Sequence, residues 1–112
     1  GVLMGAPNVV RGGSHSGNIP TSDVAKAKCL DLMSSDYVPA SLLHAAFALP
    51  EHVPGISLSD AVNVVSRNPA RVMGLDDRGE IAAGKRADLI GVRLVDGHRV
   101  VRSVGRAGER VL

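Results

Sequence analysis

The chain has 112 residues, enough for one small domain, and its 45% apolar and 21% charged residues are typical of a folded globular protein. Tyr37 and Phe47 are the only aromatic residues and Trp is absent, so a surface that stacks nucleic-acid bases, and hence a nucleic-acid partner, is not expected. Its apolar runs are too short to span a bilayer and Cys29 has no cysteine to pair with, so we expect a cytoplasmic protein with no membrane partner.

The first part of the chain has the order of two successive strand–helix units. Residues 2–6 and 30–36 are apolar runs that predict strands. Capping residues and prolines predict a short helix over residues 22–28 and a longer one over residues 39–49. This order predicts parallel neighbouring strands joined by a helical crossover.

Capping and helix-breaking residues divide the next part. Residues 50–55, rich in Pro and Gly, predict a linker, and residues 57–60 have the pattern of a capping box. The helix that follows should bury an apolar stripe of Leu58, Ala61, Val62 and Val65. Pro69 should break this helix, which restarts with the proline in its first position and ends at Gly74.

From residue 79 onward the pattern changes to short strands. We expect strands at residues 80–81, 87–94 and 99–104, with Asp96-Gly97 as a hairpin turn between the last two. The charge changes as well. Residues 1–66 carry three basic and five acidic side chains, whereas residues 67–112 carry ten basic and six acidic side chains. Acidic residues lie between the arginines, so we interpret this region as a solvated surface.

Asp36 is the first candidate for a catalytic residue. It follows a predicted strand and precedes a helix, which is where barrel enzymes place their chemistry. A carboxylate in this position can bind a metal ion and accept a proton from water. The alternative is that Asp36 only caps the helix, because helix N-termini favour aspartate.

A glycine-rich loop before residue 19 is the second candidate. Its members are Ser14, His15, Ser16, Gly17 and Asn18, preceded by a pair of glycines. Exposed backbone N–H groups followed by a helix start can bind phosphate, although the spacing of a nucleotide-binding P-loop is absent. The alternative is a surface loop without a ligand.

Two stretches carry a resemblance to a known family. Residues 68–90, which begin Asn-Pro-Ala-Arg-Val-Met-Gly, resemble the C-terminal signature of the amidohydrolase superfamily. Residues 5–18 and 34–43 are similar to the superfamily members that release diphosphate from a phosphorylated sugar phosphonate in phosphonate metabolism. Cys29 is a departure, since a glycine is expected there at the end of a helix.

The resemblance implies an α/β fold. It assigns residues 1–74 to the C-terminal portion of a (β/α)₈ TIM-type barrel, strands seven and eight with their helices, and residues 75–112 to part of a small composite β-sandwich. A complete barrel takes about 250 residues, and the His-x-His motif of the superfamily's first strand is absent from this sequence. We therefore expect the chain alone to be inactive and to self-associate through its open strand edges.

The resemblance also implies an activity for the whole enzyme. It is the hydrolysis of alpha-D-ribose 1-methylphosphonate 5-triphosphate to the 5-phosphate and diphosphate, with a divalent metal such as zinc or manganese. Asp36 would bind the metal and take the proton from water, and the loop around His15 would contact the substrate. Two alternatives stay open: another amidohydrolase, such as a cyclic amidase or deacetylase, and a non-catalytic assembly module.

Overall fold

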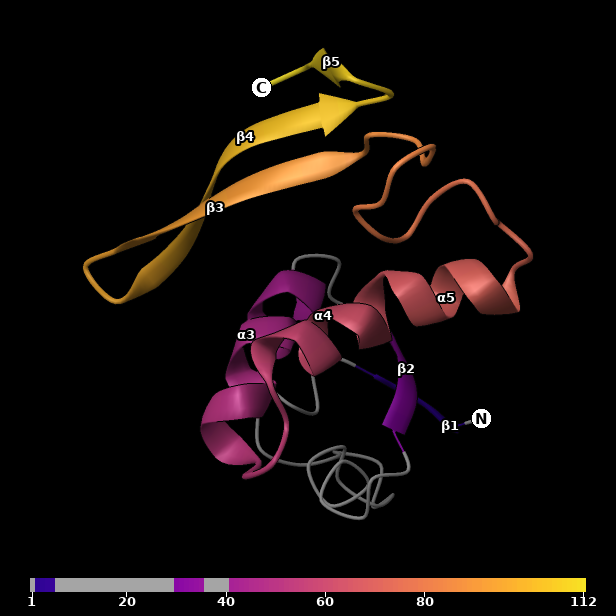
Figure 1. The fold of residues 1–112 in the computed structure, drawn as a ribbon. Helices are drawn as coiled ribbons and strands as arrows, with labels where there is room; N and C mark the ends of the chain where they lie inside the picture. Colours follow the sequence, from indigo (N-terminus) through magenta and orange to yellow (C-terminus); the bar gives the residue numbers. More distant parts are fainter. Residues whose placement is uncertain (1, 6–29, 36–40) are drawn as a thin grey trace.

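The computed structural model describes residues 2–5, 30–35 and 41–112, which form two small sheets and three helices. Figure 1 shows the helices beside the first sheet and the second sheet on the other side of the helices. The first sheet contains β1 (Val2–Gly5) and β2 (Leu30–Ser34). The helices are α3 (Ser41–His52), α4 (Leu58–Val65) and α5 (Arg67–Val72), and the second sheet contains β3 (Leu89–Val95), β4 (His98–Arg106) and β5 (Glu109–Arg110).

The strands β1 and β2 are parallel, as the sequence predicts. Their register runs from Val2 opposite Leu30 to Gly5 opposite Ser34, with an irregularity after Val2. Parallel strands need a long connection, which fits the predicted crossover. The helix expected over residues 22–28 lies outside the described residues.

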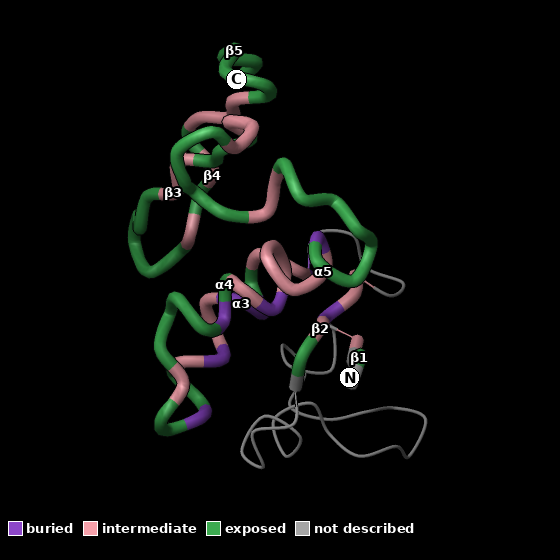
Figure 2. Tube along the Cα trace, turned by 45° about the vertical axis from the view of Figure 1, so that its right-hand side comes forward, coloured by how far each residue is buried: buried purple, intermediate pink, exposed green. Residues whose placement is uncertain are grey.

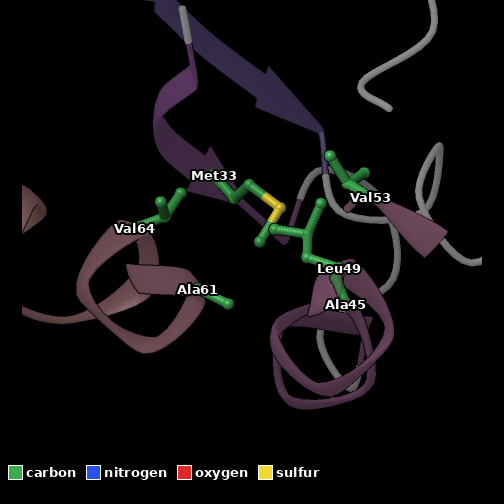
Figure 3. Close-up of a cluster of buried hydrophobic side chains, with 6 residues drawn as sticks. All are labelled: Met33, Ala45, Leu49, Val53, Ala61 and Val64. Carbon is green, nitrogen blue, oxygen red and sulfur yellow. The ribbon is translucent and has the colours of Figure 1, made fainter. Parts of the chain in front are cut away.

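The hydrophobic core lies between β2 and the first two helices. Figure 3 shows Met33 extending from β2 toward Leu49 of α3, with Val64 of α4 on its other side. Alanines on both helices keep the elements close together. The buried cluster consists of Met33, Ala45, Leu49, Val53, Ala61 and Val64. Burying a side chain such as Leu49 contributes about 1.5–3 kcal/mol, so this cluster fixes β2 against the helices.

Helix α3 ends later than predicted. The expected end at residue 49 is wrong, because α3 continues through Pro50 to His52. Proline removes one backbone N–H, yet the next turn still forms, with the N–H of Val53 donating to the carbonyl of Leu49 at 2.9 Å. Leu49 and Val53 are fully buried, and this burial stabilises the last turn against the cost of the proline.

The capping box that begins α4 is confirmed. The Ser57 hydroxyl accepts from the N–H of Asp60 at 3.0 Å, and the Asp60 carboxylate accepts from the N–H of Ser57 at 3.2 Å. The predicted apolar stripe is only partly correct: Ala61 is buried, but Leu58 and Val62 are exposed. Val64 is buried instead, because it lies on the side of α4 that packs in the same cluster as Met33.

The break between α4 and α5 comes earlier than predicted. It lies at Ser66, so Pro69 is the third residue of α5 and not the first. The first residues of a helix have no intrahelical acceptor for their N–H groups, so proline is tolerated there. The first bond of α5 runs from the N–H of Ala70 to the carbonyl of Ser66, at 3.1 Å.

The end of α5 at Gly74 is confirmed. Gly74 has a φ of +71°, and its N–H donates to the carbonyl of Arg71 at 3.1 Å. The N–H of Leu75 donates to the carbonyl of Ala70 at 2.8 Å. These two bonds form a Schellman motif, which satisfies the last carbonyls of the helix.

The second sheet contains the predicted hairpin. Asp96 and Gly97 both have positive φ, at 49° and 79°, which is the geometry of a type I′ turn between β3 and β4. A similar turn at Ala107 and Gly108 leads into β5, which the sequence analysis did not predict. The strand expected at residues 80–81 is wrong, because these residues lie in a turn-rich segment and Ile81 is 89% exposed.

Exposure differs strongly between the two parts of the molecule. Figure 2 shows the buried residues concentrated in β2 and the helices, whereas β3 to β5 are exposed or half-buried. The exposed large apolar residues from β3 to the last residue are Leu89, Ile90, Leu94, Val95, Val100, Val111 and Leu112.

The side chain of Arg99 joins β4 to α3. It pairs with Glu51, and its guanidinium carbon lies 5.2 Å from the centre of the Phe47 ring.

No helix among the described residues is long and apolar enough to cross a membrane.

Candidate active site

The candidate site residues all lie outside the described residues. They are Asp36 and the loop residues Ser14, His15, Ser16, Gly17 and Asn18. The structure describes the elements that flank Asp36 in the chain: β2, which ends two residues before it, and α3, which begins five residues after it.

Strands β1 and β2 end at the same edge of the sheet. Gly5 and Ser34, their last residues, lie opposite each other in the parallel register. Because the strands run in the same direction, the segments that follow them start from one edge. In α/β enzymes this carboxyl edge is where substrates bind. The sequence places Asp36 after one of these ends and the His15 loop after the other.

A buried serine links the two elements on either side of Asp36. The hydroxyl of Ser41, the first residue of α3, donates to the carbonyl of Ser35 at 3.3 Å. Ser41 is 5% exposed, so water competes little for this bond. The bond fixes the beginning of α3 relative to the residue that precedes Asp36.

A second polar contact links α5 to β2. The side-chain N–H of Asn68 donates to the carbonyl of Asp31 at 2.8 Å. Asn68 is the first residue of the stretch that resembles the amidohydrolase signature, so one part of that signature anchors the strand that leads to Asp36. Sequence reasoning missed both Ser41 and Asn68 as supports of the site, because each bonds to a backbone carbonyl that leaves no signal in the sequence.

The rest of the signature is structural. Gly79 has a φ of +99°, and a Cβ there would lie 2.6 Å from the Cβ of Ala70, so only glycine fits against α5. Glu80 joins two cations, with its carboxylate 3.4 Å from Arg67 and 3.2 Å from Lys85. The first cause that lowers the pKa of Glu80 is its hydrogen bond with Lys85, followed by the charge of Arg67.

Asp88 fixes the turn before β3. Its carboxylate accepts from the N–H of Ala107 at 2.8 Å and from the side chain of Arg86 at 2.9 Å. The Ala107 bond is the largest cause that lowers the pKa of Asp88 from its ordinary 3.8, and Arg86 adds to it. The Asp77 carboxyl also has a lowered pKa, chiefly because Arg78 donates a hydrogen bond to it.

The contacts of the Asp88 carboxylate predict that the stability of the folded chain depends on pH. Because the pKa of Asp88 is lower in the folded chain, its contribution is fully present above about pH 3.8 and is lost as the pH falls through the folded pKa. Urea unfolding between pH 2 and 7 should show this decline. Asp88→Asn keeps an acceptor for Ala107 but cannot titrate, so its decline should be smaller; an acid decline equal to that of the wild type would contradict the assignment.

Within the described ranges, no three His, Cys, Asp or Glu side chains gather in a group that could hold a metal ion. The donor that the sequence predicts is Asp36, which lies outside these ranges. Carboxylate oxygen suits both zinc and manganese. The chemistry of the predicted donor therefore fits a divalent metal.

Comparisons with known proteins define the class. The model of the amidohydrolase family matches residues 17–111, so the chain belongs to the amidohydrolase family. This confirms the resemblance drawn from the sequence. The family is generally metal-dependent. An amidohydrolase from Thermotoga maritima MSB8 has a similar structure, with a TM-score of 0.61 and 29% identity over 84% of this chain and 26% of that one. The likeness supports a fold of the TIM-barrel type, of which this chain has a small mixed α/β portion.

Two curated proteins are similar in sequence. The alpha-D-ribose 1-methylphosphonate 5-triphosphate diphosphatase of Escherichia coli K12 is 51% identical over 111 residues, which are 98% of this chain and 29% of that protein. The dihydroorotase of Methanopyrus kandleri is 45% identical over 58 residues, 51% of this chain and 12% of that protein. The chain thus spans less than a third of the length of either relative.

Proposed function

We propose that this chain is the C-terminal part of a divalent-metal-dependent hydrolase that converts alpha-D-ribose 1-methylphosphonate 5-triphosphate to the 5-phosphate and diphosphate. The observation that carries the proposal is the 51% identity to the Escherichia coli diphosphatase across 98% of the chain. An alignment of that extent includes the Asp36 segment and nearly all of the glycine-rich loop. The comparison with the dihydroorotase covers only about half of the chain.

In this proposal, residues 1–74 supply strands seven and eight of the barrel with their helices, and residues 75–112 supply the C-terminal share of a composite β-sandwich. The exposed apolar residues Ile90 and Leu94 of β3 support the second assignment, because they share one face of the strand and a sandwich buries one face of each sheet. The chain alone would then lack most of the barrel and be inactive. Its self-association and its cytoplasmic location stay predictions.

The chemistry follows from Asp36. A bound divalent metal would lower the pKa of water and polarise a phosphoryl oxygen. The carboxylate of Asp36 would serve as one ligand and would accept the proton of the attacking water. The other ligands would come from parts of the enzyme outside this chain, because a catalytic zinc site generally has three protein ligands.

The loop residues Ser14, His15, Ser16, Gly17 and Asn18 would bind the phosphorylated end or the phosphonate of the substrate. Phosphate groups are often bound by the loops after strands seven and eight of such barrels, and backbone N–H groups of a glycine-rich loop favour anions.

Replacing His15 by Ala in the full-length enzyme should therefore weaken substrate use by about tenfold or more in kcat/KM, the loss of one charge-assisted hydrogen bond. A rise of KM alone would indicate a contact with the ground-state substrate, and a fall of kcat would indicate a contact with the leaving diphosphate. Steady-state kinetics at a confirmed metal content distinguish the two. If neither parameter changes, the loop is a surface segment without a role in binding.

The second candidate function is hydrolysis of a cyclic amide. The similarity to a dihydroorotase favours it, although it rests on a shorter match than the first candidate. Neither of the two curated relatives described above is a deacetylase, so that alternative has no similar support. Membership in a family of hydrolases favours an enzyme over a non-catalytic assembly module.

Phosphorus NMR of the full-length enzyme with alpha-D-ribose 1-methylphosphonate 5-triphosphate tests the proposal. With a divalent metal present, diphosphate and the 5-phosphate should form in equal amounts, and a chelator should stop the reaction. Release of orthophosphate alone, or no turnover at any metal concentration, would reject the proposed reaction.

A further inference from the structure

Ser41 has an unusual environment for a polar side chain. It is 5% exposed, and its neighbours along α3, Ala45 and Ala46, are also buried. A buried hydroxyl without a partner is costly, so such groups almost always form hydrogen bonds. Here the hydroxyl donates backwards, to the carbonyl of Ser35 at 3.3 Å.

The elements at both ends of this bond are held by the core. Met33, two residues before Ser35, is 4% exposed and belongs to the buried cluster. Ala45, one turn after Ser41, belongs to the same cluster. The bond therefore joins two elements that are each packed in the core.

The carbonyl that accepts this bond has a direct geometric relation to Asp36. The carbonyl of Ser35 belongs to the peptide bond between residues 35 and 36. A peptide unit is planar from one Cα to the next, so holding its oxygen restricts the plane that ends at the Cα of the following residue. The side chain of Asp36 departs from that Cα.

We propose that Ser41 is a positioning residue for the reaction, which acts by holding the peptide plane from which the Asp36 side chain departs. This inference rests on the proposed function, since it assigns Asp36 its catalytic role. Misplacement of a reacting group by about 1 Å can cost up to 10²-fold in rate. Loss of one supporting hydrogen bond displaces the group less, and we expect about a tenfold fall in kcat.

The test compares Ser41→Ala, Ser41→Thr and Ser41→Cys in the full-length enzyme. The Ala variant should lose about tenfold in kcat with KM within about twofold of the wild type, because substrate contacts are unchanged. Thr keeps the hydroxyl and should recover most of kcat. Cys fills the same space but is a weak donor, so it should remain slow, and it replaces the Ala variant if that protein does not fold.

Ser66→Ala is the matched control. The hydroxyl of Ser66 donates to the carbonyl of Val62 at 2.7 Å, so this variant also loses a bond from a serine to the backbone, but the bond lies at the end of α4 and not beside Asp36 in the chain. Thermal unfolding should shift in both Ala variants, whereas kcat should fall only in Ser41→Ala. This separates a loss of positioning from a general loss of stability.

Three results would overturn the proposal: an Ala variant with kcat within about twofold of the wild type, a Cys variant with restored kcat, or an equal loss of kcat in Ser66→Ala. A Cys variant with restored kcat would show that Ser41 acts by filling space. A wild-type enzyme that releases no diphosphate would instead overturn the proposed function, and the role of Ser41 with it. An active wild type with an unaffected Ser41→Ala variant would overturn the role of Ser41 alone.

Discussion

Replacing Asp36 by Asn in the full-length enzyme is expected to lower kcat by about 10²-fold or more, which is typical for removal of a general base. The amide has nearly the same size, but it cannot accept the proton of the attacking water and is a weaker metal ligand. Because the change is nearly isosteric, the fold should be retained. The measurement is kcat at saturating substrate and metal, with far-UV circular dichroism to confirm the fold.

Asp31→Asn is a suitable control for this experiment. Asp31 is an exposed carboxylate on the same strand, and only its backbone carbonyl accepts the bond from Asn68, which the substitution leaves in place. The control removes the same charge five residues before Asp36 and should keep kcat within about twofold, since a charge that is exposed to water is strongly screened. An Asp36→Asn variant with near-normal turnover at saturating metal would show that Asp36 only caps the helix.

The largest expected effect on stability comes from Gly79→Ala. The new Cβ would lie 2.6 Å from the Cβ of Ala70, 3.1 Å from the carbonyl oxygen of Ser66 and 3.2 Å from the Cα of Arg67. Overpacking of this kind costs roughly 1–3 kcal/mol, and left-handed backbone adds roughly 1–2 kcal/mol for a residue with a Cβ. We expect the free energy of unfolding to fall by roughly 2–5 kcal/mol.

Gly84→Ala separates the two causes. Gly84 has a φ of +82° but no atom within 4 Å of the added Cβ, so only the backbone cost of roughly 1–2 kcal/mol remains. Urea unfolding of both variants gives the difference between them. If the two substitutions destabilise the protein equally, the close approach of Gly79 to α5 does not hold in solution.

The local chemistry of short segments was the most predictable part of the fold. The capping box at Ser57, the helix end at Gly74 and the turn at Asp96-Gly97 each depend on residues within five positions of one another. Such features are therefore visible in the sequence. The type I′ turn at Ala107-Gly108 was missed, because alanine rarely adopts the positive φ of 50° that it has there.

Features that depend on tertiary packing were not predictable. The sequence around Pro50 indicates a helix end, but burial of Leu49 and Val53 carries α3 past it. Leu58 and Val62 have the right spacing for a buried stripe, yet the core lies on another side of α4. Burial is decided by neighbours that are distant in the chain, and a helical pattern cannot identify them.

The same distinction holds for the candidate site. Asp36 was identified from its place between a strand and a helix, and the glycine-rich loop from its composition. The residues that support the site were not identified. Ser41 donates a hydrogen bond to a carbonyl six residues away in the chain, and Asn68 donates one to a carbonyl 37 residues away. Any residue can supply a backbone carbonyl, so only the three-dimensional structure reveals these contacts.

The measurement that tests the central claim most directly is the substrate preference of the full-length enzyme. We would compare kcat/KM for alpha-D-ribose 1-methylphosphonate 5-triphosphate with kcat/KM for a cyclic amide such as dihydroorotate, under the same metal conditions. The account predicts a preference of about 10³-fold or more for the phosphorylated sugar, because binding groups built for phosphate are left unpaired by a substrate without one. A preference for the cyclic amide would contradict the account and assign the chain to a cyclic amidase.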